Sequence, residues 1–375
     1  MALAMMTPAA IDDVDTTTAV VYCEGNFGAI DGKTANGLVR HSERYRILSV
    51  IDSALAGQDA GVALGEKHKA IPICRDLEHA LSSAEFVPDS FIFGMAPASG
   101  MMSKKERGVV LSAMALGMHV VNGLHEFLSE DAEFLAASAA HGVRILDIRK
   151  PRSKRELRLF TGRIAEVTCP RIAVLGTDCA IGKRTTATIL TKELNELGLN
   201  AVLVGTGQTG LIQGARYGVA LDAVPSQFCS GELEATILEA FEKEQPDVIV
   251  IEGQGSLSHP AFSTSSLILR GCHPDGVILQ HAPARSHRCD FEGMPMPSPA
   301  DEIRLIEMFA KTKVIGLTIN HENMTDAEVQ LAVASYATEL EIAVTDPLTG
   351  PADRLTGMVF TAFPQLVCKR TLQTS

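Results

Sequence analysis

The sequence predicts an α/β protein with two domains, each built on a parallel sheet that helices cover. The chain has 375 residues, whereas a typical domain has roughly 100–200. Short runs rich in valine and isoleucine alternate with longer segments of helical periodicity, and this order is typical of parallel βαβ units. Hydrophobic residues make up 46% of the chain, which is enough to fill two cores.

The first half of the sequence predicts an N-terminal domain that we expect to span residues 19–150. Its clearest helices are expected at residues 104–118 and 131–141. The acidic segment 1–18 before it has no basic region and is interpreted as a disordered leader, not a secretory signal. Strands are expected at residues 19–25, 45–51, 90–96, 119–123 and 143–149.

The second half repeats this logic and predicts a C-terminal domain over residues 171–375. Residues 151–170 are interpreted as a linker with a basic cluster, either simply solvated or acting as an anion-attracting patch. Gly198 is expected to end the first helix of the second domain. Strands are expected at 171–176, 200–205, 247–253, 275–281 and 313–319, and helices at 183–197, 232–244, 301–311 and 326–340.

Charge and cysteine usage exclude several classes of protein. The net charge of −12 argues against a general nucleic-acid binder, which needs clustered Lys and Arg, but leaves room for a small anionic ligand in a local basic pocket. No apolar run approaches about 18 residues, so no membrane span is expected. The eight cysteines form no CxxC pair, which is typical of reduced thiols, and we expect a cytoplasmic protein.

The stretch "GTDCAIGKRTT" predicts a phosphate-binding loop, because a buried-strand pattern precedes it and a helical pattern follows. Backbone N–H groups and the helix N-terminus would create the anion site, with a lysine side chain adding charge. The alternative is a plain glycine turn. The candidate anion-binding residues are Gly176, Thr177, Asp178, Gly182, Lys183, Arg184, Thr185 and Thr186.

Arg184 separates this loop from the usual G-x4-G-K-[ST] pattern, which places a magnesium-binding hydroxyl directly after the lysine. Moving the hydroxyl one residue along a helix turns it by about 100° and lifts it by about 1.5 Å. The loop therefore suits an anion that arrives without obligatory Mg²⁺, although a distorted turn would restore Thr185. The later strand "DVIVIEG" ends in Glu252, as a metal-positioning acid strand does. The use of Mg²⁺ is left open.

Two resemblances follow from these motifs. "GTDCAIGKRTT" with "IEGQGSLSHP" resembles the loop and acid strand of dethiobiotin synthetase-type enzymes. A closer match covers nearly the whole chain and resembles a two-domain bacterial and archaeal family described as D-glutamate N-acetyltransferases. It implies a Rossmann-like N-terminal domain, a P-loop NTPase-like C-terminal domain and acetyl transfer from acetyl-CoA to the amine of D-glutamate. The matching segments are "GLVRHSERYRILSVIDS", "FIFGMAPASG", "VVNGLHEFLSED", "GTGQTG" and "LQHAPAR", together with the two motifs above.

Acetyl transfer to an amine requires that the CoA phosphates and the substrate carboxylates be held, that a base take the ammonium proton and that donors stabilise the oxyanion. The loop is the candidate for the phosphates. A rival CoA site is the turn "EGNFGAIDGKT", whose glycines Gly25, Gly28 and Gly32 precede Asp52 at the end of the next strand. Otherwise that segment is a turn.

For the carboxylates we expect Arg285 and Arg288, because arginine binds carboxylates in a bidentate manner. Arg40 and Arg149 are weaker candidates, and any of the four can instead form a surface ion pair. Glu252 is the leading candidate for the base, and His259 and His281 are alternatives. Glu252 can instead be a metal-positioning acid, and either histidine can simply be packed in the protein. Substrate or oxyanion contacts are expected from Gln208, Thr209, Gln254 and Ser256, which can equally stabilise turns.

The sequence predicts no metal site. The cluster Cys272, His273, His281, His287 and Cys289 lacks the pair spacing of zinc ligands. Asn320 is interpreted as an adenine contact or a loop cap. The leading function is an N-acetyltransferase for a small acidic amino acid, expected to be a homodimer. The alternatives are an ATP-dependent ligase or kinase of the dethiobiotin-synthetase type and a non-catalytic nucleotide- or CoA-sensing protein.

Overall fold

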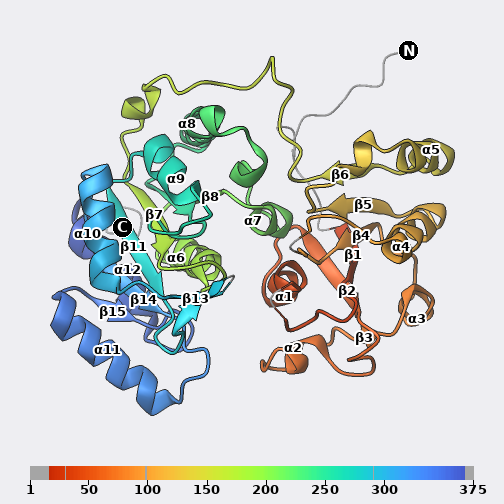
Figure 1. Cartoon of the computed structure of the whole chain (residues 1–375), viewed down its shortest axis with the longest axis horizontal. Coiled ribbons are helices and arrows are strands. Elements are labelled where there is room, and N and C mark those ends of the chain that lie inside the picture. The colour runs from red at the N-terminus through yellow and green to blue at the C-terminus, as the bar shows by residue number, and fades with distance from the viewer. Residues whose placement is uncertain (1–16, 30, 98, 290, 368–375) are drawn as a thin grey trace. The chain divides into compact units, whose positions relative to one another are not determined.

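The computed structural model describes residues 17–29, 31–97, 99–289 and 291–367. Almost all of the expected leader, residues 1–18, lies outside this part of the chain. Two compact units make up the structure. The first contains the chain up to Arg155 together with Gln208–Arg216, and the second contains Glu156–Gly207 and the chain from Tyr217 onward. Each unit is an α/β layer structure with its own parallel sheet (Figure 1).

The first unit has a sheet with the strand order β3-β2-β1-β4-β5-β6 in the described part of the chain. All neighbouring strands pair in parallel, and the order reverses between β1 and β4, which is the arrangement of a Rossmann-like fold. The strands are β1 (Thr17–Tyr22), β2 (Tyr45–Ile51), β3 (Ile73–Cys74), β4 (Ser90–Phe93), β5 (His119–Asn122) and β6 (Ile145–Asp147). The helices are α1 (Lys33–Arg40), α2 (Ala60–Ala63), α3 (Leu77–Ser82), α4 (Lys104–Ala115), α5 (Ala132–His141) and α7 (Gln208–Gln213).

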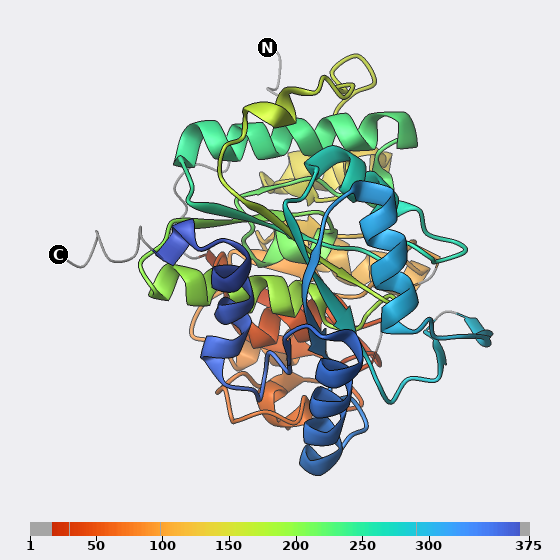
Figure 2. The same ribbon diagram turned by 90° about the vertical axis from the view of Figure 1, so that its left-hand side faces the viewer.

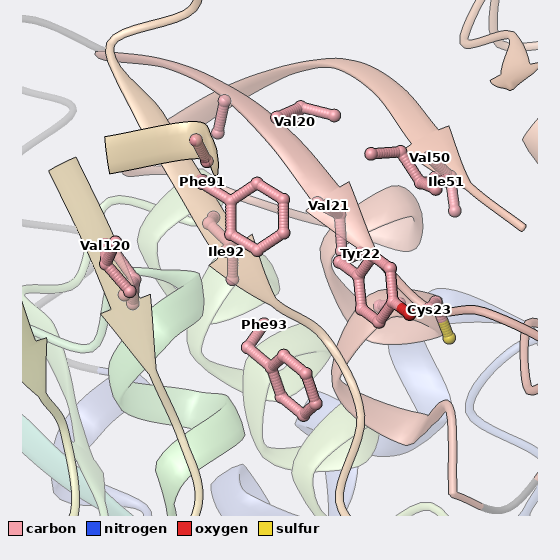
Figure 3. Close-up of a cluster of buried hydrophobic side chains, with 14 of the residues drawn as sticks. Val20, Val21, Tyr22, Cys23, Val50, Ile51, Phe91, Ile92, Phe93 and Val120 are labelled. Carbon is pink, nitrogen blue, oxygen red and sulfur yellow. The ribbon is translucent and has the colours of Figure 1, made fainter. Parts of the chain in front are cut away.

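The core of the first unit is centred on its middle strands, where side chains on both faces are buried (Figure 3). Tyr22 stacks on Phe93 with ring centroids 5.6 Å apart, and the ring centroid of Phe91 lies 5.9 Å from that of Tyr22. Strands that helices cover on both faces have no polar face, which explains their continuous apolar runs. Capping fixes the helix starts: Ser103 and Glu106 form a capping box at α4.

The second unit has a sheet with the order β15-β14-β11-β7-β10-β8-β9, again with all neighbours parallel in the described residues. Its strands are β7 (Arg171–Gly176), β8 (Ala201–Gly205), β9 (Tyr217–Gly218), β10 (Val248–Glu252), β11 (Gly276–His281), β14 (Val314–Ile319) and β15 (Val344–Thr345). A separate antiparallel hairpin pairs β12 (His287–Arg288) with β13 (Phe291–Pro295). The helices are α6 (Lys183–Glu196), α8 (Ser226–Glu244), α9 (Thr264–Cys272), α10 (Pro299–Ala310), α11 (Asp326–Leu340) and α12 (Ala352–Ala362).

Two apolar clusters lie on opposite faces of this second sheet. One packs α6 and α12 against Ile172, Val174 and Val250. The other packs α8 to α11 against Ala173 and Leu175, the alternating residues of the same strand β7. The long helix α8 and the helices α10 and α11 are clearly visible around the sheet in Figure 2. The α/β class with two parallel sheets is therefore as predicted, and among the described residues no helix is long and apolar enough to cross a membrane.

The predicted elements mostly coincide with the observed ones. β2, β7 and α11 begin and end at the predicted residues. The prediction for α8 was wrong at its start, because the helix begins at Ser226, right after Pro225, and not at Glu232. No residue range was predicted for helices α1, α2, α3, α7, α9 and α12. Gly198 follows the end of α6 with φ +87°, as expected for a residue that terminates a helix.

Candidate phosphate-binding site

The loop between β7 and α6 has the geometry of an anion-binding turn. Gly176 must be glycine, because a Cβ there would lie 2.7 Å from Ile181 Cδ1 and 2.9 Å from Lys183 Cδ, inside the wrapped loop. Gly182 has φ +102°, a conformation that side chains disfavour. No side chain caps the N-terminus of α6, so the first backbone N–H groups of this helix can donate to an anion.

Lys183 is buried inside this loop and carries the charge that the loop offers. Its Nζ donates to the backbone carbonyl of Asp178 at 2.5 Å. Burial lowers the pKa of the lysine, and the nearby Cys179, Asp178, Cys289 and Glu252 side chains oppose that shift. A bound phosphate would supply the compensating negative charge that a buried ammonium lacks.

Two threonine hydroxyls follow Lys183 and Arg184 in the first turn of α6. Thr185 is half-buried. Thr186 is wholly buried and donates to Gln280 Oε1 at 2.5 Å, and Thr318 donates to the same oxygen at 2.6 Å. This network fastens α6 to β11 and β14. Arg184, at the position where a magnesium ligand is usual, interacts electrostatically with Glu252.

Asp178 is the anchor of the loop. Its side chain is fully buried, and Oδ2 accepts hydrogen bonds from Arg285 Nη1 at 3.1 Å and from the backbone N–H of Cys289 at 2.8 Å. The other oxygen, Oδ1, lies 3.8 Å from His259 Nε2 and 3.9 Å from Arg288 Nη1. The two guanidinium groups beside the carboxylate offset its charge, which weakens its repulsion of a phosphate in the loop.

Arg285 and Arg288, the candidates for carboxylate binding, both contact the loop itself. Arg285 donates to Cys179 O at 2.9 Å and pairs with Glu322 at 2.7 Å. Arg288 is 7% exposed, and donates to Ser256 Oγ at 2.9 Å and to Thr177 O at 3.3 Å. Both guanidinium groups thus hold the loop in shape, and most of their donors are already used.

Glu252 lies at the end of β10, beside the same loop. It accepts from the backbone N–H of Thr206 at 3.1 Å. Burial raises the pKa of its carboxyl group, while the Arg184 charge, the backbone hydrogen bonds from Thr206 and Gly207 and the Lys183 charge lower it. Gln254 donates to Thr206 O, and with Ser256 it completes the turn after β10. The structure therefore brings Glu252, Gln254 and Ser256 to the loop.

The two histidine candidates are packed into hydrogen-bond networks. His281 Nδ1 lies 2.8 Å from Thr177 Oγ1, and its Nε2 lies 3.3 Å from the hydroxyl of Tyr336. Burial, with a contribution from the Arg285 charge, lowers the pKa of His281 to about 4. His259 accepts at Nδ1 from two backbone N–H groups and stacks on Phe262 at 4.6 Å between ring centroids. Both imidazoles therefore lie against residues of the loop, His281 at Thr177 and His259 at Asp178.

Gln208 and Thr209 follow Gly207, whose backbone N–H donates to Glu252. They belong to α7, which is part of the first unit, where the Thr209 and Thr34 hydroxyls are 3.0 Å apart. In the same helix, Gln213 donates to the carbonyls of Gly37 and His41 at the end of α1, both at 2.7 Å. Helix α7 thus packs on α1 through polar contacts.

In the rival glycine-rich turn of the first unit, the carboxylate of Asp52 is hydrogen-bonded to the backbone. Asp52 is 1% exposed and accepts from Phe27 N at 3.0 Å and from Ala54 N at 2.9 Å. Both carboxylate oxygens are therefore engaged by the backbone, unlike an acid that binds a ribose. Of the weaker arginine candidates, Arg40 pairs with Glu66 at 2.8 Å and Arg149 is buried against Gly123 O.

Several residues that shape the site were not expected from the sequence. Gln280 and Glu322 come from strand ends far along the chain, and Glu302 is a buried helix residue that accepts from the N–H of Leu257 at 2.6 Å. Cys179 and Cys289 lie close to Lys183.

Comparison with known proteins agrees with this architecture. The Rossmann-like domain DUF1611_N, a domain of unknown function, matches residues 53–151. The P-loop domain DUF1611_C, also a domain of unknown function, matches residues 158–356. The crystal structure of a DUF1611 family protein from Anabaena variabilis superposes with a TM-score of 0.85 at 30% identity, covering 92% of this chain and 99% of that chain.

Two curated relatives carry the name D-glutamate N-acetyltransferase. One, from a Pseudoalteromonas species, is 32% identical over 280 residues, which cover 73% of this chain and 82% of the relative. The other, from Tritonibacter scottomollicae, is 28% identical over 274 residues, which cover 71% and 79%. With both domains and these relatives matched, the chain belongs to the two-domain DUF1611 family, in agreement with the family that its motifs predict.

Proposed function

We propose that the protein is an N-acetyltransferase that moves the acetyl group of acetyl-CoA to the amine of D-glutamate. The relatives named D-glutamate N-acetyltransferase support the reaction class and the substrate. The structural observation that carries the proposal is the phosphate loop with Lys183 and Arg184 in succession and the Thr186 hydroxyl committed to Gln280. Such a loop favours gripping a phosphate over splitting a magnesium nucleotide.

In this proposal the loop holds a phosphate of CoA. The uncapped N–H groups of α6 donate to the phosphate oxygens, and Lys183 and Arg184 supply two positive charges. The neutral amine of D-glutamate attacks the thioester carbonyl carbon, and the tetrahedral intermediate collapses as its carbon–sulfur bond breaks. The remaining extra proton on the nitrogen passes to the leaving sulfur, so that CoA leaves as the thiol. The products are N-acetyl-D-glutamate and CoA. The proton from the substrate ammonium goes to a base of the protein.

Glu252 is the proposed base, and its position sets a condition on the mechanism. Burial raises its pKa, which makes the carboxylate a stronger proton acceptor. However, Glu252 interacts with both loop cations, so it lies beside the phosphate site. The pantetheine arm separates the CoA phosphates from the thioester. Glu252 can therefore act on the amine only if the arm folds back toward the loop.

The proposal is tested by thiol release from acetyl-CoA with D-glutamate, L-glutamate or no acceptor, beside phosphate release from ATP with the same acceptors. We expect thiol release that depends on D-glutamate and no release of phosphate. Acceptor-dependent phosphate release without free thiol would instead identify a ligase or kinase. Binding of CoA without any product would identify a sensor.

A further inference from the structure

A second group of reactive side chains lies in the phosphate loop and directly after strand β12. One ligand atom each from Asp178, Cys179 and Cys289 lie within 4.8 Å of one another. Asp178 and Cys179 belong to the loop, whereas Cys289 follows strand β12. Asp178 is buried, and both cysteines are partly exposed. The geometry points to a binding site for a thiophilic divalent cation, zinc above all, with two sulfur ligands and one carboxylate oxygen.

The separations suit tetrahedral zinc. Zinc binds sulfur at about 2.3 Å and carboxylate oxygen at about 2.0–2.2 Å, so ligand atoms of a tetrahedral site are about 3.6–3.8 Å apart. The three atoms here lie within 4.8 Å of one another, so they need to close by at most about 1.2 Å to reach this spacing. Three protein ligands leave a fourth position for water. Carboxylate and thiolate ligands together exclude magnesium and calcium, which prefer oxygen alone.

A separate observation concerns the oxygens of Asp178. Oδ2 accepts two hydrogen bonds, but Oδ1 has no hydrogen-bond partner although the side chain is wholly buried. Buried polar atoms are nearly always bonded, so a carboxylate oxygen in this state needs an explanation. A cation bound beside this carboxylate provides one, in addition to the longer contacts of Oδ1 with His259 Nε2 and Arg288 Nη1.

His259 is not a fourth ligand. Its Nδ1 accepts from the N–H groups of Ala261 and Phe262, so its proton is on Nε2, which faces Asp178 Oδ1 at 3.8 Å. A protonated nitrogen cannot coordinate a metal. It can orient the carboxylate, as the residues behind metal ligands commonly do.

The charges around the cluster fit a metal bound by thiolates. The groups that face it are Lys183, Arg285, Arg288 and, through Lys183, Glu252. Two thiolates and a carboxylate carry three negative charges. A bound divalent cation would reduce the net charge of the cluster to −1, and the neighbouring cationic side chains offset this remaining charge. On binding, the metal–sulfur bonds form as the two thiols release their protons to solvent.

Ligand spacing in the sequence gave no hint of this site. Of the cluster considered there, Cys272 is buried in the apolar core and His273 packs against Phe160 with tilted rings. His287 is exposed. His281 and Cys289 both reach the loop, but His281 is bonded to Thr177 and Tyr336. Cys289 thus joins Cys179, which comes from a distant segment. A metal held this way would tie the phosphate loop to the β12–β13 hairpin.

The test measures metal binding to the full-length reduced protein, without reference to activity. Cobalt(II) is titrated as a spectroscopic probe, since thiolate-to-cobalt charge transfer counts sulfur ligands, and zinc affinity is measured by competition with a chromophoric chelator. We expect about one equivalent of zinc, as in other single tetrahedral sites. Cys179→Ser and Cys289→Ser should each lower zinc affinity at least about tenfold and halve the charge-transfer band.

Cys229→Ser is the matched control, because Cys229 is buried in the same unit and its Sγ contacts only the carbonyls of Leu221, Val224 and Pro225 in the contacts described. It should bind zinc as the wild type does. Zinc should also raise the melting temperature of the wild type and of Cys229→Ser, but not of Cys179→Ser. Equal zinc affinity in all four proteins, or a Cys179–Cys289 disulfide that persists under reduction and blocks metal binding, would overturn the proposal.

Discussion

Replacing Lys183 with methionine separates anion binding from folding. The lysine is buried, and burial disfavours its charged form. Methionine keeps the apolar stem and removes the ammonium, so the unfolding free energy should stay the same or rise. The hydrogen bond from Lys183 to Asp178 O is lost, at a cost of about 1 kcal/mol, but the desolvation of the buried ammonium is relieved.

Binding of CoA should respond in the opposite direction. A hydrogen bond to a charged group contributes about 1.5–3 kcal/mol, and each 1.4 kcal/mol is a factor of about ten in Kd. Lys183→Met should therefore weaken CoA binding about 10- to 150-fold. Isothermal titration calorimetry with CoA measures the Kd, and thermal unfolding of the same samples measures stability.

Lys192→Met is the matched control for this experiment. Lys192 lies on the same helix with its side chain 66% exposed, and it pairs only loosely with Glu196 at 3.7 Å. Its replacement should change Kd by less than about twofold, since exposed charges interact weakly with distant ligands. If Lys183→Met binds CoA within about threefold of the wild type, the loop is not the phosphate site and the reasoning from its geometry fails.

Three further predictions follow from the same unit. Glu252→Gln should lower kcat by about 10²–10⁴-fold if Glu252 is the base, whereas a rise in KM for acetyl-CoA at unchanged kcat would assign it to ordering the loop cations. Gly253→Ala should destabilise the fold by about 3 kcal/mol or more, because its Cβ would lie 2.1 Å from the carbonyl oxygen of Val174. Gly108→Ala has open space around its Cβ and should stabilise the fold by about 0.5–1 kcal/mol. Chemical denaturation measures the unfolding free energy of both variants. Because the pKa of His281 is lowered to about 4 in the fold, the unfolded state binds the extra proton between pH about 6.5 and 4, and the wild type should lose about 3 kcal/mol more stability over this range than His281→Gln.

The strands were predictable because their pattern is local. A run of five or so apolar residues between turn residues is typical of a strand covered on both faces, and β7 and β2 follow this rule to the residue. Helix α1 could not be found in this way. Its sequence contains Gly37 and its N-terminus has no side-chain cap, so burial of Thr34–Val39 against the sheet and α7 is what stabilises it.

The site was predictable only as far as it is continuous in sequence. The loop, Lys183 and Glu252 were expected next to each other, and the structure brings them together. Arg285 and Arg288 were expected there too, but as ligands for substrate carboxylates. Composition cannot distinguish an arginine that faces a ligand from one that binds backbone carbonyls, and in the structure both donate to the loop.

The relation between Arg184 and Glu252 bears most directly on what the loop does. In a nucleotide-hydrolysing protein, the hydroxyl after the loop lysine and the acid-strand carboxylate hold a magnesium ion between them. Here the corresponding carboxylate interacts with a guanidinium, and the nearest buried hydroxyl, that of Thr186, is directed to Gln280. A fixed side-chain cation thus balances the carboxylate that a metal would otherwise balance. Arg184→Ser restores the usual pattern. If the arginine replaces the metal, this variant should gain magnesium-dependent affinity for ATP and lose affinity for CoA. Calorimetry measures the Kd of both ligands for the variant and the wild type.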